Sequence, residues 1–149
     1  MGLRVNGTGA PDTELALTVG ATDRFEPNHV TWNLHGAGPQ ILAPTASQSL
    51  LRACVILTDC DWAAISSTDI DHWQTAAPDG PTIGWSTYLA HRLLPDGPPE
   101  VPGVAVEPVH RGYLLTSTTR PEHTDRSTVL AVASTVMHRR PAGQGGLQR

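Results

Sequence analysis

Apolar residues recur along this chain with two different periods, and the order of these periods restricts the fold more than any other feature. They alternate with polar residues over 14–20 and 29–35, which is typical of half-buried strands. A period near 3.6 predicts a helix over 125–140. Its apolar face consists of Val129, Val132, Ala133, Val136 and Met137. Strand and helix patterns mixed in this way favour a sheet with helices packed against it.

A second helix is predicted over 45–58. Thr45 and Gln48 have the spacing of a capping box, in which each side chain satisfies a free amide of the first turn. Along this helix Leu50, Cys54 and Leu57 line one face, with Leu51, Val55 and Thr58 beside them. Asp59 ends the run.

The rest of the chain contains three further strand patterns and one ambiguous segment. Strands are predicted over 62–67, 104–109 and 113–118, the last two joined by a tight turn at 110–112. Pro108 cannot donate a ladder hydrogen bond, so it belongs at a sheet edge or a strand end. Residues 84–94 fit both helical and strand spacing.

Together these patterns predict one α+β domain over 13–140. Its mostly antiparallel sheet has about five or six strands, and its two main helices span about 45–58 and 125–140. Residues 1–12 and 141–149 are rich in glycine and other small or polar residues, and we expect both ends to be flexible.

Composition excludes several classes of protein. The formal net charge is −4, which argues against nonspecific nucleic-acid binding, and no apolar run approaches the length of a membrane span. No secretory signal pattern is visible, and Cys54 and Cys60 are too few for a disulfide framework. We therefore expect a cytoplasmic protein with reduced thiols.

Motifs that carry chemistry are weak. The seven histidines lack HxH or HxxxH spacing, the cysteines lack CxxC spacing, and no glycine-rich phosphate loop is complete, so we predict no metal and no cofactor. Gly84-Trp85-Ser86 partly matches a nucleophile elbow but lacks its second glycine. A small hydrolase using Ser86 therefore stays open only as an alternative.

One acidic stretch stands out between residues 59 and 73. It contains four aspartates, no arginine and a tryptophan near each end. Two interpretations are possible: a solvated loop with core tryptophans, or a contact surface for a basic partner. The residues of this predicted partner-binding surface are Asp59, Asp61, Trp62, Asp69, Asp71 and Trp73.

Residues 60–138 resemble the immunity protein 52 family of bacterial polymorphic-toxin systems. The matching segments are CDWAAISS at 60–67, GWSTYL at 84–89, VPGV at 101–104, VEPVHRGYLLTSTTRPEHTD at 106–125 and VLAVASTVM at 129–137. The resemblance implies a small cytoplasmic antidote that binds and occludes a cognate toxin domain, without chemistry of its own. Toxins associated with the family include restriction-endonuclease-like nucleases.

The acidic stretch would suit such a toxin, because a nuclease active site is basic where it holds phosphate. This assignment is our hypothesis and is not implied by the family. A protein-interaction module of another kind, such as a secretion adaptor or chaperone, would share the same bulk features.

Overall fold

The computed structural model describes residues 2–6, 13–18, 29–34, 44–74, 81–119 and 123–138. Within these ranges, seven strands form one sheet in the order β1-β2-β3-β4-β5-β7-β6. The strands are β1 (Gly2–Asn6), β2 (Thr13–Thr18), β3 (His29–Leu34), β4 (Trp62–Ser66), β5 (Ser86–Ala90), β6 (Val104–Val109) and β7 (Gly112–Ser117). The helices are α1 (Pro44–Thr58), α2 (Thr68–Trp73), the 3-10 turn η1 (His91–Leu93) and α3 (Arg126–His138).

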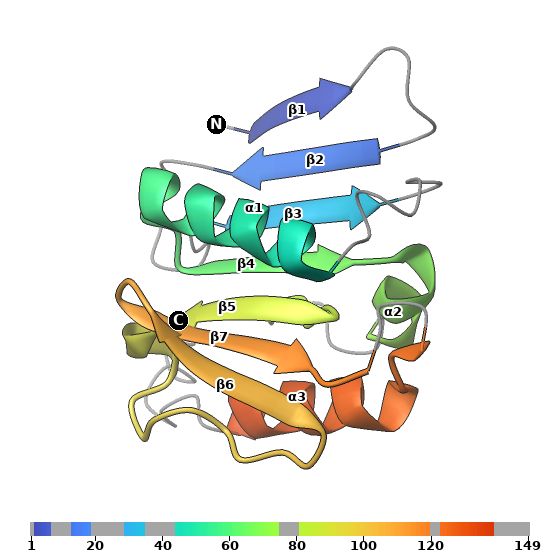
Figure 1. Cartoon of the computed structure of the whole chain (residues 1–149), viewed down its shortest axis with the longest axis vertical. Coiled ribbons are helices and arrows are strands. Elements are labelled where there is room, and N and C mark those ends of the chain that lie inside the picture. Colours follow the sequence, from blue (N-terminus) through green and yellow to red (C-terminus); the bar gives the residue numbers. More distant parts are fainter. Residues whose placement is uncertain are drawn as a thin grey trace, which may run out of the picture.

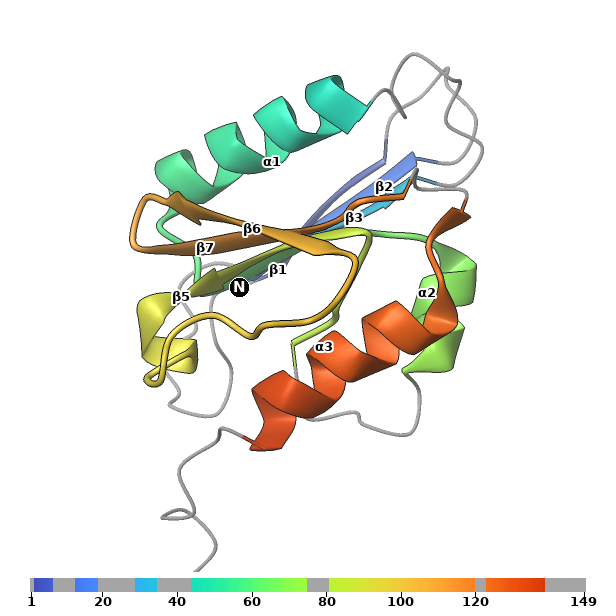
Figure 2. The same cartoon turned by 60° about the horizontal axis from the view of Figure 1, so that its bottom comes forward.

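The α+β class and the mostly antiparallel sheet are confirmed. Neighbouring strands are antiparallel except β3 and β4, which run parallel and are connected through α1. The described sheet has slightly more strands than the five or six expected. Helix α1 lies on one face of the sheet, whereas α2 and α3 lie on the other, as Figures 1 and 2 show from two sides.

This sandwiching explains why residues 84–94 were ambiguous. Every residue of β4 and of β5 is buried, because both faces of these central strands are covered. A strand buried on both faces does not alternate polar with apolar residues, so its period is hidden. The segment resolves into strand β5 followed by the turn η1.

Two details predicted for α1 are wrong. The helix already begins at Pro44, a favoured residue in a first helical turn, so Thr45 lies inside the helix and does not cap it. The buried stripe is also shifted: Leu51 and Val55 are 2% and 0% exposed, whereas Leu57 is 84% exposed. Both stripes of this helix are apolar, and periodicity alone could not decide which of them faces the sheet.

The prediction for the second main helix is confirmed over its described part. Val129, Val132, Ala133 and Val136 are buried against the sheet, and the helix begins directly after Asp125. Ser127 donates a hydrogen bond to the Asp125 carboxylate, and this bond, with backbone N–H groups of the first turn, holds the pKa of Asp125 below its ordinary value.

The ends of the sheet differ in part from expectation. Gly2–Asn6 forms β1 on β2 where a flexible end was expected, since backbone pairing can order a strand whatever its side chains, and the rest of the range 1–12 lies outside the described residues. The hairpin turn consists of His110 and Arg111 alone, and β6 is an edge strand, as Pro108 predicts. The flexible tail predicted over 141–149 lies outside the described residues.

Candidate functional site

The structure divides the acidic stretch into two groups. Asp59 and Asp61 precede β4, whereas Asp69 and Asp71 lie on α2, which follows β4. At about 3.3 Å per residue, the five residues of β4 place the two groups roughly 17 Å apart. The four carboxylates therefore do not form one continuous acidic surface.

Asp59 is engaged in holding α1 to the β6–β7 turn. It has a left-handed backbone (φ 46°), and its N–H donates to the Val55 carbonyl at 3.0 Å, a common way for a helix to end. Its carboxylate lies 2.8 Å from Nε2 of His110 and 3.1 Å from Nη1 of Arg111. The hydrogen bond with His110, followed by the charge of Arg111, lowers the pKa of the Asp59 carboxyl.

The other members of the predicted surface are mainly structural. Asp61 is 5% exposed and forms an ion pair with Arg92, and the adjacent Trp62 belongs to the hydrophobic core. On α2, Asp71 accepts a hydrogen bond from the Ser66 hydroxyl, whereas Asp69 is exposed. Trp73 is half-buried and packs against the core. These contacts favour the interpretation of this stretch as structural.

Ser86, the nucleophile of the hydrolase alternative, lies in the core. It is 0% exposed, and its hydroxyl is 3.0 Å from Oγ1 of Thr116 on the neighbouring strand. A nucleophile must reach its substrate and must be hydrogen-bonded to a base. Ser86 meets neither condition, and a serine hydrolase built on it has no support.

Metal and thiol chemistry find equally little support in the described part of the chain. No group of three or more His, Cys, Asp or Glu side chains there could hold a metal ion. Cys54 and Cys60 are both free, and burial raises the pKa of each thiol. A raised pKa keeps a thiol protonated and unreactive at neutral pH.

The outer side of α1 is an exposed apolar surface, here called the helix face. It consists of Leu50, Ala53, Ile56 and Leu57. Ile56 and Leu57 are 58% and 84% exposed, although the opposite side of the same helix is buried in the core. Arg52 is the only charged residue of α1. The half of the helix from Leu50 to Leu57 therefore carries apolar side chains on its outer side as well as on the side that faces the sheet, which is more apolar surface than one core contact requires.

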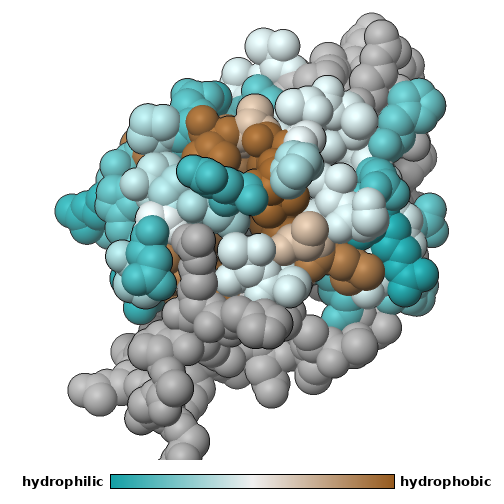
Figure 3. All heavy atoms as spheres, turned by 90° about the horizontal axis from the view of Figure 1, so that it is seen from below, coloured by the Kyte–Doolittle hydropathy of each residue, from teal (hydrophilic) through white to brown (hydrophobic). Residues whose placement is uncertain are grey.

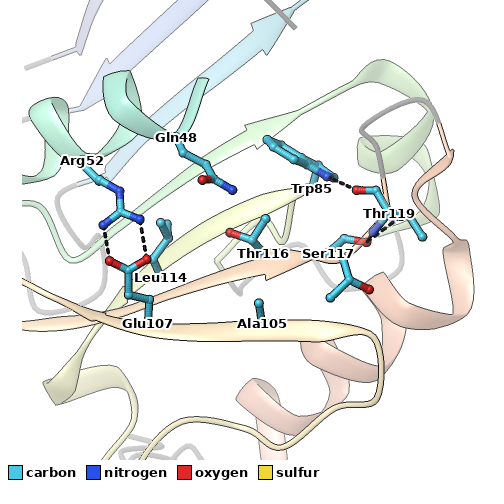
Figure 4. Close-up of a pocket in the computed structure, with 10 residues that line it drawn as sticks. Gln48, Arg52, Trp85, Ala105, Glu107, Leu114, Thr116, Ser117 and Thr119 are labelled. Carbon is cyan, nitrogen blue, oxygen red and sulfur yellow. Dashed lines mark hydrogen bonds and ion pairs between the residues drawn. The ribbon is translucent and has the colours of Figure 1, made fainter. Parts of the chain in front are cut away.

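Beside the helix face, an open pocket of about 440 Å³ lies between α1 and the β5–β7–β6 part of the sheet. We call it the sheet pocket (Figure 4). Its lining residues are Gln48, Arg52, Trp85, Ala105, Glu107, Leu114, Thr116, Ser117, Thr118 and Thr119. Leu114 and Thr116 of β7 form its buried floor, whereas Ala105 and Glu107 of the edge strand β6 are exposed.

An ion pair closes one end of the sheet pocket. Arg52 Nη1 and Nη2 donate to Oε1 and Oε2 of Glu107, each at 2.5 Å, in the two-pronged geometry of a guanidinium and a carboxylate. This contact lowers the pKa of the Glu107 carboxyl and raises that of Arg52, so both remain charged. At the other end, the Trp85 indole N–H donates to the Thr119 carbonyl at 2.8 Å.

A second apolar area lies where β6 and α3 meet. Figure 3, which views the molecule from this end, shows apolar side chains gathered at the centre of the face. Val106 and Leu130 are the large apolar residues exposed on these two elements, at 39% and 36%. Pro108 lacks an N–H on the free edge of β6, which hinders the addition of another strand. Both residues are far less exposed than Leu57, so the helix face is the stronger candidate.

Sequence reasoning missed the residues of the helix face and the sheet pocket as a site. Arg52 and Glu107 are separated by 55 positions, and no local pattern shows that they pair. One usable signal was present: a helix with a single charge and two apolar stripes has more apolar surface than one core contact requires.

Comparison of the chain with protein-family models, with curated proteins and with solved structures gives no match. The resemblance to the immunity protein 52 family therefore stays a prediction. Among the described residues, no helix has both the length and the apolar character needed to cross a bilayer.

Proposed function

We propose that this protein is a non-enzymatic antidote of the immunity type, which neutralises a cognate toxin domain by binding and occluding it. The observation that carries the proposal is the helix face, where Leu57 and Ile56 are exposed on a helix already buried on its other side. Contiguous apolar exposure of this kind marks protein-interaction sites. The family resemblance of residues 60–138 supplies the kind of partner.

The proposal moves the contact surface from the acidic stretch to α1. Asp59 and Asp61 are each paired with an arginine, so that end of the sheet offers little net negative charge to a basic partner. The helix face, by contrast, has no counterpart within the described structure that covers it. A nuclease as the toxin follows from the resemblance alone and is not needed for this assignment.

The size of the expected effect follows from burial. Burying one leucine side chain contributes about 1.5–3 kcal/mol, and 1.4 kcal/mol corresponds to about tenfold in a dissociation constant. Replacing Leu57 by an aspartate removes this contribution and also buries a charge at the interface. We expect Leu57→Asp to weaken toxin binding by at least about tenfold.

The experiment co-expresses the chain with the protein encoded by the adjacent gene and measures growth, complex formation and the dissociation constant. The antidote should rescue growth, and Leu57→Asp should lose that rescue while it still folds. Ala131→Asp is the matched control, because it adds the same charge at an exposed position of α3, on the opposite face of the sheet. Toxicity without rescue by the unaltered chain would refute the proposal and leave an adaptor or chaperone as the better reading.

A further inference from the structure

The sheet pocket contains a polar side chain that has no partner within the described structure. Gln48 lies on the α1 wall, is half-buried, and its carboxamide points into the pocket (Figure 4). No hydrogen bond links it to another described residue, although a carboxamide offers two donors and two acceptor sites. Thr116 and Thr118 also line the pocket, but their hydroxyls are already hydrogen-bonded, to the Ser86 hydroxyl at 3.0 Å and to the Gly103 carbonyl at 3.2 Å.

The two charged side chains of the pocket, in contrast, form an ion pair with each other. Arg52 and Glu107 are its only charged lining residues, and they neutralise each other through two parallel hydrogen bonds. A charged group entering the pocket would lose water and find no unpaired opposite charge. An uncharged group with donors and acceptors would instead find the Gln48 carboxamide ready to bind.

The pocket and the helix face form one continuous surface. Arg52 belongs to the pocket and Ile56 to the helix face, and residues four apart are neighbours on a helix surface. A partner that packs on Ile56 and Leu57 therefore lies directly beside the pocket opening. The volume of about 440 Å³ lies in the lower half of the range of ligand pockets and accommodates one inserted side chain with its backbone.

We infer that the sheet pocket receives an uncharged, hydrogen-bonding side chain of the toxin, an asparagine or a glutamine, which pairs with Gln48 while the helix face packs against the surrounding surface. This inference rests on the proposed function and specifies the chemistry of recognition at the same site. A second carboxamide matches that of Gln48, because each supplies both a donor and an acceptor.

The test measures the dissociation constant of the toxin complex by calorimetry, at low and high salt, for four variants. Gln48→Leu keeps the size of the side chain but removes its hydrogen bonds, and we expect about fivefold to tenfold weaker binding. Arg52→Gln and Glu107→Gln each leave one charge of the pair unpaired and should shift the constant in the same direction, whereas the double variant, which removes both charges, should show little salt dependence. Gln48→Met serves if the leucine variant folds poorly.

The outcomes separate the inference from the proposed function. Opposite effects of Arg52→Gln and Glu107→Gln would show a charged occupant and overturn the inference. Unchanged binding by Gln48→Leu would also overturn the inference. If Leu57→Asp still abolished binding in that experiment, the proposed function would remain intact. If the unaltered chain does not bind the toxin, both fail.

Discussion

Replacing Gly84 by alanine tests how closely β4 and the start of β5 approach each other. A Cβ at this position would lie 2.0 Å from the carbonyl oxygen of Ile65 and 2.7 Å from its carbonyl carbon. Ordinary contacts begin near 3.4 Å, so the two backbones must separate by more than 1 Å. The hydrogen bond from the Trp85 N–H to the same carbonyl, 2.9 Å long, would be stretched or lost.

The magnitude follows from these two effects. Forcing extra volume into a packed interior costs about 1–3 kcal/mol, and a lost hydrogen bond costs about 1 kcal/mol more. We expect Gly84→Ala to lower the free energy of unfolding by about 3 kcal/mol. In a chain of this size, 1 kcal/mol shifts Tm by about 2–4 °C, so Tm should fall by about 9 °C.

Gly97→Ala is the matched control for thermal unfolding followed by circular dichroism. An added Cβ at Gly97 meets no atom within 4 Å, and its only penalty is the left-handed backbone (φ 88°), about 1 kcal/mol. Gly84→Ala should therefore melt clearly below Gly97→Ala. If the two variants melt at the same temperature, the close approach of the two backbones is refuted.

Three further predictions concern α1 and the ion pairs. Leu51→Ala should lower the free energy of unfolding, measured by urea titration, by about 2–5 kcal/mol. Leu57→Ala on the same helix should change it by less than about 0.5 kcal/mol, since Leu51 is buried and Leu57 is exposed. Equal losses in the two variants would contradict this orientation of α1. Arg92→Ala should lower the free energy of unfolding by about 2 kcal/mol in the same assay, because the buried carboxylate of Asp61 loses its guanidinium partner. A change below about 0.5 kcal/mol would show that the ion pair does not stabilise the fold. The pKa of the Asp59 carboxyl lies below its ordinary 3.8, so its contribution to stability is complete above about pH 4 and is lost as the pH falls through the lower pKa. Asp59→Asn should therefore reduce the fall of Tm below pH 4. If Tm falls with pH in the same way in both proteins, the contribution of Asp59 is refuted.

The sequence was informative where one face of an element is apolar and the other polar. The α3 stripe through Val129 and Val136 was predicted correctly because its opposite side is polar, and the hairpin around 110–112 followed from two strand patterns separated by a short turn. β5 could not be assigned, because burial on both faces removes the alternation that identifies a strand.

The candidate site was hidden for a different reason. The acidic stretch looked like one surface because its members are close in sequence, but strand β4 runs between Asp61 and Asp69 and carries them to opposite ends. The sheet pocket has the reverse property, since Arg52 and Glu107 are distant in sequence and meet only through the fold. Spacing along the chain predicts a shared helix face, but it does not predict neighbours across a sheet.

The error in the α1 stripe is itself an argument about function. Periodicity could not choose between the stripe of Leu50 and Leu57 and that of Leu51 and Val55 because both are apolar, and a core contact requires only one of them. A surface helix normally has a polar outer side, but the outer side of α1 between Leu50 and Leu57 is apolar. The sheet covers one side of α1, and the remaining stripe is accounted for if a partner covers it in the complex. The feature that made the orientation of α1 unpredictable from sequence is therefore the feature on which we base the proposed position of the partner.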